Sequence, residues 1–264
     1  MAWGWAGAFF AGRAVRFAAP PPFDEELADA AAALRRSRRP MIVAGGGTLY
    51  GLATDALKRF AELHGAPVAE TQGGKGSLAW DHPLQAGAIG VTGSPAANAL
   101  AREADCVLAI GTRLQDFTTG SHALFPQARL VSLNVNGFDA LKWHGTMLRA
   151  DARRGLEALS AALGGWRSDE GWRVRATDEA ARWRADLARV TGVRDVALPC
   201  DGEVIGAVQR SAADSPRDDI VVCAAGTLPG ELHKLWRTSA PGGYHVEYGY
   251  SCMGYEIPGG IGVK

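Results

Sequence analysis

The chain has 264 residues, of which 47% are hydrophobic and 21% charged, and this balance is that of a globular protein and excludes a disordered or fibrous one. At roughly 150 residues per domain, the length is enough for about two domains. The 28 basic residues offset the 28 acidic ones, so no net field would hold a nucleic acid, and we expect no nucleic-acid partner. The apolar opening, residues 1–12, is shorter than the roughly 18 residues that span a bilayer, so we expect no membrane partner and no signal peptide.

The N-terminal part of the chain predicts a linker, a helix, a strand and a second helix. Residues 1–22 end in three prolines, which stiffen the chain and stop helices, and are interpreted as a linker. A helix is predicted from Phe23 because its start is acidic, its end is rich in arginine, and Pro40 stops it. Residues 41–44 form a short apolar run, and after three glycines apolar residues recur at helical spacing over 49–60.

Strands and helices continue to alternate beyond this point. The patterns predict strands over 67–70, 106–110 and 129–133 and helices over 95–102 and 151–163. Each parallel strand pair needs a crossover connection that returns across one face of the sheet. The sequence therefore predicts an α/β domain over residues 23–164, with a mostly parallel sheet covered by helices on both faces.

The remaining residues predict a connection and a shorter second unit. Residues 165–199 are rich in Arg, Asp, Glu and Trp, contain no buried strand, and predict a connecting helix. From Cys200 a helix, a strand ending in a glycine turn and another helix follow, and a glycine-punctuated apolar loop then runs to Lys264. One β-α-β unit is too little sheet to cover its own faces, so residues 200–264 are expected to be a truncated second α/β domain.

Three turns follow predicted strands, where open α/β sheets bind ligands. Gly45–Gly47 could cradle a phosphate, but Tyr50 stands at the last glycine position of G-x-G-x-x-G, which favours a tight turn. Lys75, among glycines, is expected to contact an anion or to lie in a surface loop. Arg113 and Asp116 are expected near the same crevice, as ligand contacts or as an ion pair or helix cap.

Motifs for metal or nucleophilic chemistry are missing from the sequence. The six histidines are widely separated, and neither H-E-x-x-H nor G-x-S-x-G occurs. We therefore assign no catalytic residue and no metal ligand within this chain. The cysteines form no C-x-x-C pair, which fits reduced thiols and a cytoplasmic location; they are Cys106, Cys200, Cys223 and Cys252.

Several long runs together resemble one family. They are ETQGGKGSLAWDHP (70–83), GAIGVTGSPAANALAREADCVLAIGTRLQDFTTGS (87–121), AAGTLPGELHKLW (224–236) and HVEYGYSCMGYEIPGGIGVK (245–264). The runs resemble thiamine-diphosphate enzymes, and within them the hydrolases that open the ring of a cyclic dione in myo-inositol breakdown. These are long strings rather than spaced single letters, so the resemblance is specific, and it covers nearly the whole chain after about Phe9.

The resemblance implies a fragment of a larger enzyme. Such enzymes carry three α/β domains: one binds the pyrimidine of the cofactor, one is central, and one binds the diphosphate. Residues 1–22 would then be a linker from a missing pyrimidine-binding domain, 23–164 the central domain, 165–199 the connection, and 200–264 the truncated start of the diphosphate-binding domain. The resemblance places the activating glutamate and the Mg²⁺ ligands outside this chain, so we expect the fragment to be inactive alone.

The resemblance also implies cofactor contacts. The turn Ala225–Leu228 would approach the diphosphate through amides at a helix start. Met253 would prop the cofactor in its bent shape, and the backbone of Ser251 and Met253 would bond the aminopyrimidine. The glycines beside them leave the main chain free to approach a ring. The expected cofactor-binding residues are Gly226, Thr227, Leu228, Ser251, Cys252, Met253 and Gly254.

The implied function is ring opening with thiamine diphosphate and Mg²⁺. The cofactor, not a protein side chain, would attack one carbonyl of the small-molecule cyclic dione, the adjacent carbon–carbon bond would break, and water would release an open-chain product. The parent enzyme is expected to be a homo-oligomer. Two alternatives stay open: an acetolactate-synthase-like carboligase or decarboxylase, and a non-catalytic nucleotide-binding module built on the central domain, although no flavin is assigned.

Overall fold

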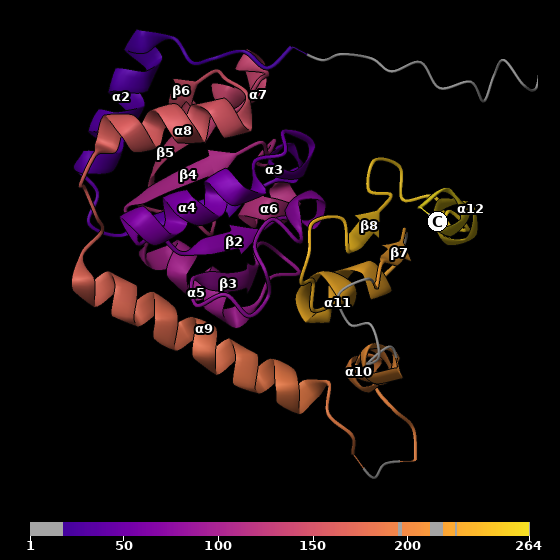
Figure 1. Cartoon of the computed structure of the whole chain (residues 1–264). Coiled ribbons are helices and arrows are strands. Elements are labelled where there is room, and N and C mark those ends of the chain that lie inside the picture. The colour runs from indigo at the N-terminus through magenta and orange to yellow at the C-terminus, as the bar shows by residue number, and fades with distance from the viewer. Residues whose placement is uncertain (1–17, 195–196, 212–218, 225, 264) are drawn as a thin grey trace, which may run out of the picture.

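The computed structural model describes residues 18–194, 197–211, 219–224 and 226–263. Most of the expected linker, residues 1–17, and Ala225 of the predicted cofactor turn therefore lie outside the described residues. The described residues form a large unit around a six-stranded sheet and a small unit around two strands (Figure 1). A long helix, α9 (Glu170–Val190), runs from the large unit to the small one (Figure 1).

The large sheet is entirely parallel, with strand order β3-β2-β1-β4-β5-β6. Its strands are β1 (Pro40–Ala44), β2 (Val68–Glu70), β3 (Gln85–Ala88), β4 (Cys106–Ile110), β5 (Arg129–Leu133) and β6 (Thr146–Leu148). The predicted α/β class with a parallel sheet is confirmed. The sequence analysis missed β3 and β6, the two strands at the edges of this sheet.

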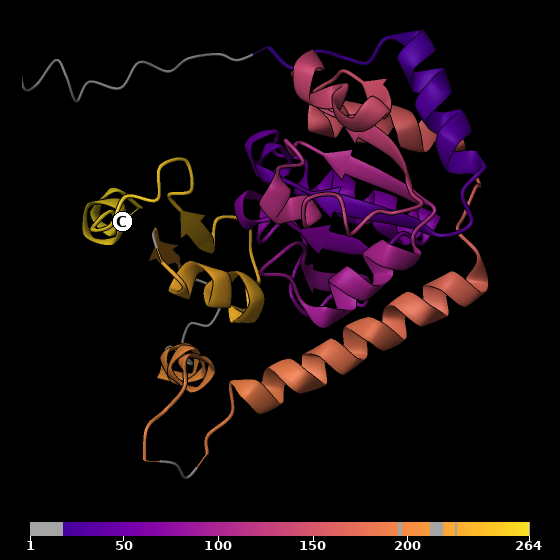
Figure 2. The same ribbon diagram turned by 180° about the vertical axis from the view of Figure 1, so that it is seen from behind.

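Helices cover both faces of the sheet, as predicted. On one face lie α2 (Asp24–Arg35), α4 (Thr54–His64) and α8 (Ala152–Leu163). On the other lie α5 (Pro95–Glu103) and the first half of α9, which the view from behind brings forward (Figure 2). Because neighbouring side chains of a strand point to opposite faces, Ile42 packs into the first core and Val43 into the second. Burial on both faces explains the continuous apolar runs of β1 and β4.

Two predicted helices have different limits in the structure. The first was expected to continue to Pro40, but α2 ends at Arg35. The carboxylate of Asp105 accepts hydrogen bonds from the amides of Arg38 (3.0 Å) and Arg39 (3.1 Å), which holds the chain in a turn instead. The helix expected over 49–60 is split into α3 (Gly46–Tyr50) and α4 by a turn that contains Leu52, with φ of +49°.

The triple glycine after β1 forms a tight turn against the turn after β4. The amide of Gly45 donates to Ile110 O (2.8 Å) and that of Gly47 to Gly111 O (3.0 Å). A Cβ at Gly111, where φ is +56°, would lie 2.4 Å from the Cα of Gly47. The glycines therefore allow two backbones to touch, as the tight-turn interpretation predicts.

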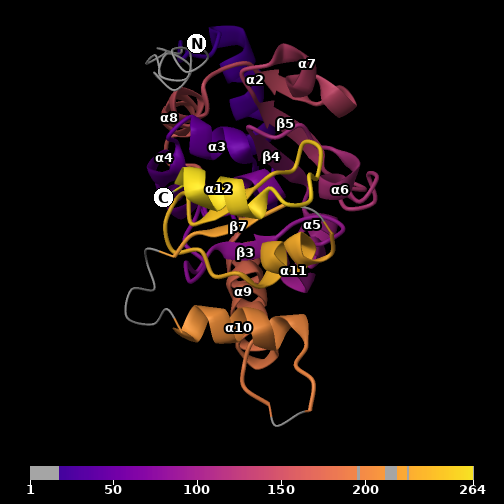
Figure 3. The same cartoon turned by 90° about the vertical axis from the view of Figure 1, so that its right-hand side faces the viewer.

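The small unit contains one β-α-β motif, as predicted. The second strand of that motif and a final helix lie within the segment that was expected to be a loop. Its elements are α10 (Asp201–Ser211), β7 (Val221–Cys223), α11 (Leu228–Leu235), β8 (Tyr244–Val246) and α12 (Glu256–Val263). β7 and β8 pair in parallel. The prediction of a loop after α11 was wrong, because β8 gains its partner β7 and α12 then turns back in front of the strands (Figure 3).

The small unit shares its core with α9 of the connection. Leu232, Trp236 and Tyr244 of the small unit pack with Trp183 and Leu187 of α9. This shared core fixes the small unit against the large one. Among the described residues, no helix combines the length and the apolar character that a bilayer crossing requires.

We predict that Gly111→Ala lowers the free energy of unfolding by about 3 kcal/mol, because left-handed strain of roughly 1–2 kcal/mol adds to overpacking of roughly 1–3 kcal/mol. Gly120→Ala is the matched control, since its φ is also +56° but its added Cβ would meet only Leu124 side-chain atoms, at 3.4 Å and beyond. In Gly120→Ala the free energy of unfolding should fall only by the cost of the strain, about 1–2 kcal/mol. Urea unfolding measures both. Equal losses would contradict a backbone contact at Gly111.

Candidate functional site

A crevice of about 1200 Å³ lies at the carboxyl ends of β1 and β4 and reaches the small unit. The connections after these two strands leave toward opposite faces of the sheet. Open α/β folds bind ligands at the point where two such connections diverge. The large unit contributes Gly46, Gly47, Thr112, Arg113, Gln115, Asp116 and Lys142 to its wall. The small unit contributes Gly226, Thr227, Gly230, Tyr248, Gly249 and Ser251. The crevice is therefore the candidate functional site.

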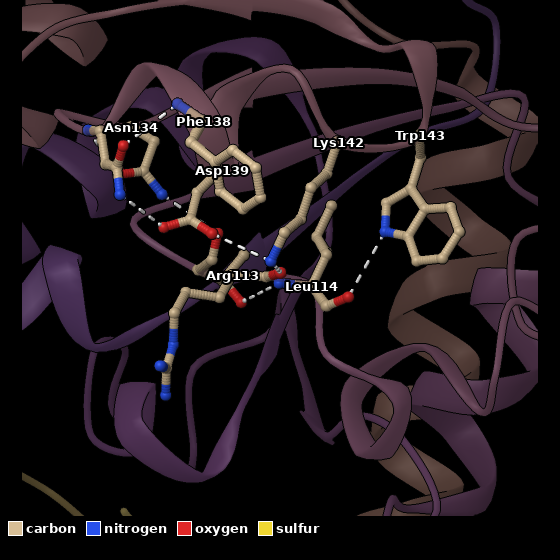
Figure 4. Close-up of polar contacts among 9 residues, drawn as sticks. Arg113, Leu114, Asn134, Phe138, Asp139, Lys142 and Trp143 are labelled. Atoms are coloured by element: carbon tan, nitrogen blue, oxygen red, sulfur yellow. Dashed lines mark hydrogen bonds and ion pairs between the residues drawn. The ribbon is translucent and has the colours of Figure 1, made fainter.

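Lys142 binds two loops together at one wall of the crevice (Figure 4). Its Nζ lies 2.9 Å from Oδ1 of Asp139 and donates to the carbonyl oxygen of Arg113 at 3.0 Å. Its charge is therefore already paired. The Arg113 side chain is exposed and points away from this pair (Figure 4), and it makes no hydrogen bond or ion pair with the residues that the structure describes. Arg113 is the cation of this wall that is available to an anionic ligand.

A chain of amide contacts fixes the same two loops. Asn134 donates through Nδ2 to Thr112 O (3.1 Å), and Asn136 donates through Nδ2 to Oδ2 of Asp139 (3.1 Å). Sequence reasoning missed these residues. The spacing of Asn136 and Asp139 after an apolar strand is a helix-start signal, and Asn136 does cap the short helix α7 (Gly137–Ala140). The wall that carries Arg113 is thus held by side chains that follow β5.

Arg113 and Asp116 both line the crevice, so their predicted location is confirmed. Asp116 begins the short helix α6 (Asp116–Thr119). The alternative of an ion pair between them is wrong within the described part of the chain, because none is formed there, and the residue at the N-cap of α6 is Gln115. The two side chains therefore face the crevice separately.

Both interpretations predicted for Lys75, an anion contact at the crevice and a residue of a surface loop, are wrong. Its side chain is only 6% exposed, because the small unit covers the loop after β2. Burial lowers its pKa to about 8, while the nearby Glu70 carboxylate opposes that shift. Burial also raises the pKa of Glu70 above its ordinary value, against the attraction of Lys75. Lys75 is therefore part of the joint between the units, neither a surface residue nor a contact of the crevice.

The expected cofactor residues fall into two groups in the structure. Gly226, Thr227 and Ser251 line the crevice, and Leu228 begins α11 beside it. Cys252, Met253 and Gly254 lie outside the crevice lining, in the exposed loop between β8 and α12. All of these residues follow the carboxyl ends of the two parallel strands of the small sheet: Gly226, Thr227 and Leu228 come after β7, and Ser251–Gly254 come after β8.

The loop that carries Ser251 and Cys252 folds around Glu247. The carboxylate of Glu247 accepts hydrogen bonds from the amides of Cys252 (2.7 Å) and Tyr250 (2.9 Å), and these bonds lower its pKa. Ser251 adopts a positive φ of +53° within this turn. Met253 follows with its side chain 89% exposed, so nothing in the described chain packs over it.

Two glycines leave open space at the expected cofactor contacts. Gly226 has φ of +94° and Gly254 has φ of +90°, and an added Cβ at either would meet no atom of the described residues within 4 Å, chain neighbours aside. At the start of α11, Pro229 has no N–H, and the amides of Gly230 and Glu231 donate to Thr227 O, at 2.9 and 3.2 Å. The amides of Thr227 and Leu228 have no backbone partner among the described residues. An accessible turn with the two unbonded amides of Thr227 and Leu228 in front of a helix fits a phosphate group of an anionic ligand.

His233 is a functional candidate that sequence reasoning missed. It lies on α11, is 1% exposed, and its Nε2 is 2.9 Å from Glu70 O while its Nδ1 is 3.2 Å from Oγ1 of Thr92. Burial, followed by the charge of Lys75, lowers its pKa to about 3, so the ring is neutral at physiological pH. Its partners lie far away in the sequence, and no local signal points to them. His233 fastens α11 to the large unit.

Comparisons with known proteins identify the large unit and match the whole chain. The model for "Thiamine pyrophosphate enzyme, central domain" matches residues 27–159. The chain is 40% identical to 3D-(3,5/4)-trihydroxycyclohexane-1,2-dione hydrolase of Geobacillus thermodenitrificans (strain NG80-2), over 100% of the chain and 44% of the relative. It is 36% identical to the hydrolase of the same name in Bacillus anthracis (strain A0248), with the same coverage of both chains. The chain thus spans less than half the length of these curated relatives.

We predict that His233 makes the protein sensitive to acid. Its pKa is about 3 in the folded chain and near 6.5 when unfolded, so between these pH values only the unfolded chain takes up the proton, and stability falls as the pH drops below about 6.5. His233→Asn should make the loss shallower by up to about 1.4 kcal/mol per pH unit. Urea unfolding between pH 7 and pH 4 measures the slope. His144→Asn, at an exposed histidine, should keep the parent slope, and an unchanged slope in His233→Asn would contradict the assignment.

Proposed function

This chain belongs to the thiamine pyrophosphate enzyme family through its central domain, and on that premise we propose that it is a section of a thiamine-diphosphate-dependent hydrolase that opens the ring of 3D-(3,5/4)-trihydroxycyclohexane-1,2-dione. The observation that carries this proposal is identity of 36–40% to hydrolases of that name along the full length of the chain. The proposed reaction is hydrolysis of a carbon–carbon bond that yields 5-deoxyglucuronate in myo-inositol breakdown.

The chemistry of the proposed reaction comes from the cofactor and its placement from the protein. When bound, thiamine diphosphate supplies a carbon nucleophile that attacks a carbonyl and takes up the electrons of the broken bond. We propose that the amides of Thr227 and Leu228, at the N-terminus of α11, hold the diphosphate and that Gly226 lets it approach. We propose that the loop of Ser251, Cys252, Met253 and Gly254 supports the rings. The catalytic glutamate and the Mg²⁺ ligands are assigned to parts of the parent enzyme other than this sequence.

The proposal includes the domain plan. Residues 23–164 are proposed as the central domain, which the family match over 27–159 supports. Residues 165–199 are proposed as the connection and 200–264 as the beginning of the diphosphate-binding domain, which the parallel β7-α11-β8 motif supports. On this plan, the isolated chain holds one side of the cofactor site and is inactive.

The proposal also covers assembly and location. A homo-oligomeric parent is supported by exposed apolar side chains in the last described segment: Met253 is 89% exposed, and Ile257 and Ile261 of α12 are each 74% exposed. A cytoplasmic location is supported by the cysteines, all four of which are unpaired thiols.

We expect an enzyme completed with the flanking segments of the Geobacillus thermodenitrificans relative to hydrolyse the cyclic dione only when thiamine diphosphate and Mg²⁺ are supplied. Pyruvate should be turned over at least about 100-fold more slowly, because a site shaped for one substrate class loses transition-state contacts with another. Product formation from each substrate, followed by mass spectrometry, measures the preference.

The isolated chain and the relative itself are the controls for this assay. The relative shows that the segments used for completion are active, and the isolated chain should release no product. Preferential use of pyruvate would support the acetolactate-synthase-like alternative. Tight, metal-independent binding of the cofactor to the isolated chain in calorimetry would contradict the proposed domain plan.

A second candidate function is nucleotide binding in the crevice, which the position of the crevice favours, together with Arg113, whose side chain has no partner among the described residues. If the chain acts as a nucleotide-binding module, ADP should bind, and Arg113→Ala should weaken binding about tenfold through loss of a charge-assisted contact. Arg129→Ala is the control, because Arg129 is exposed at the start of β5, the opposite end of the strands. Fluorescence titration with ADP and FAD measures both. Absence of binding in the parent chain would exclude this candidate.

A further inference from the structure

The side-chain amide of Gln72 is used at both ends, and both partners belong to the small unit. Gln72 lies in the short 3₁₀ turn Gln72–Gly74 after β2 of the large unit. Its Nε2 donates to Pro229 O at 3.0 Å, and its Oε1 accepts from the hydroxyl of Tyr244 at 2.6 Å. The Tyr244 hydroxyl also lies 3.3 Å from Pro229 O, so the three groups form a closed triangle.

The two partners of Gln72 lie on the two segments that carry the expected cofactor contacts. Pro229 follows Leu228 directly, in the first turn of α11, so its carbonyl is adjacent to the turn that begins at Gly226. Tyr244 begins β8, and the strand leads into the loop that holds Ser251. One side chain of the large unit therefore touches both segments, at residues that are 15 positions apart in the sequence of the small unit.

The triangle is partly buried: Gln72 lies at the wall of the crevice, whereas Tyr244 is enclosed. Tyr244 is 6% exposed, and burial raises the pKa of its hydroxyl far above the ordinary value, so the group stays a hydrogen-bond donor. The Sγ–H of Cys223 donates to the same hydroxyl at 3.4 Å, which leaves the hydroxyl proton for Gln72. A buried hydroxyl or amide that loses a partner is unfavourable, so both segments are stabilised in the positions where they meet Gln72.

The far end of α11 is fixed independently. His233 is held by Glu70 O and Thr92 Oγ1, both in the large unit. His233 thus anchors the C-terminal half of α11, and at the first turn of the helix Gln72 binds Pro229. The contact of Gln72 thus sets where the candidate phosphate turn sits.

We propose that Gln72 is a positioning residue that sets, from the central domain, the location of both candidate cofactor segments: the start of α11 and the loop after β8. The proposal rests on the proposed function for the role of these segments, and the clamp itself rests only on the contacts described above. It gives the central domain a direct part in building the cofactor site.

Hydrogen–deuterium exchange of the full chain, followed by mass spectrometry of peptides covering 226–232 and 244–254, tests the clamp without cofactor. Gln72→Leu removes both contacts and should speed exchange about tenfold in both peptides. Gln72→Glu keeps the acceptor for Tyr244 but loses the donor to Pro229, so only 226–232 should exchange faster. Tyr244→Phe should do the reverse and affect mainly 244–254.

If Gln72 and Tyr244 only contributed to packing, the two variants would not affect different peptides. Gln127→Leu is the matched control, because Gln127 is exposed on the large unit, and it should leave both peptides unchanged. If Gln72→Leu does not fold, Gln72→Glu and Tyr244→Phe still carry the test. Equal loosening of both peptides in these two variants, or no change in either, would overturn the proposal.

Adding thiamine diphosphate with Mg²⁺ to the enzyme completed with the flanking segments of the relative separates the clamp from the proposed function, because the isolated chain is proposed to hold only one side of the cofactor site. Protection of 226–232 by the cofactor in the completed enzyme, with affinity at least tenfold lower when Gln72→Leu is introduced, supports the positioning role. Equal affinity in the two would overturn it. If the cofactor protects nothing in the completed enzyme, the proposed role of these segments fails, and exchange without cofactor alone decides whether the clamp exists.

Discussion

Burial of the central sheet on both faces is the constraint from which the candidate site follows. Apolar side chains on both sides of β1 and β4 require cover on each face. In the strand order, β1 continues to β2 on one side and β4 continues to β5 on the other, so right-handed crossovers take their connections to opposite faces. The turns that begin these connections diverge above a common point, where Gly45, Gly47 and Gly111 bring the two backbones into contact. The crevice lies beyond that contact, so its position is a property of the topology before any ligand is considered.

The small unit depends on the large one for its own structure. Two short strands cannot bury an apolar face alone, and the core around Trp236 and Tyr244 is completed by Trp183 and Leu187 of α9. The polar contacts of His233 with Glu70 and Thr92 then fix the orientation that apolar packing leaves open. The second wall of the crevice is therefore placed by the first, and the two walls act as one site.

Sequence patterns predicted the elements whose signal is local. β1, β4 and β5 are five-residue strands, mostly apolar runs, followed by turns, and they were placed within one residue. β3 (QAGA) and β8 (YHV) carry no such run and are strands only because a partner strand is beside them. α12 contains a proline and three glycines, a composition that opposes a helical prediction.

The same distinction separates the predicted site residues from the missed ones. Arg113 and Asp116 were expected at the crevice because they follow a strand directly, and position after a strand is visible in sequence. Lys75 follows a strand as well, but the small unit buries it, and no local pattern shows that cover. Gln72 binds a carbonyl 157 residues away, so its role exists only in the folded chain.

The family match and the expected cofactor contacts concern different parts of the chain, and the crevice is what connects them. The central-domain match ends at residue 159, whereas the expected contacts begin at Gly226. Gly226, Thr227 and Ser251 nonetheless line the same crevice as Gly46 and Arg113 of the central domain. A ligand held by the small unit would therefore lie against the central domain. Central-domain residues such as Gln72 and Arg113 line the crevice in which such a ligand would lie, although no domain boundary drawn on the sequence would assign them to the candidate cofactor site.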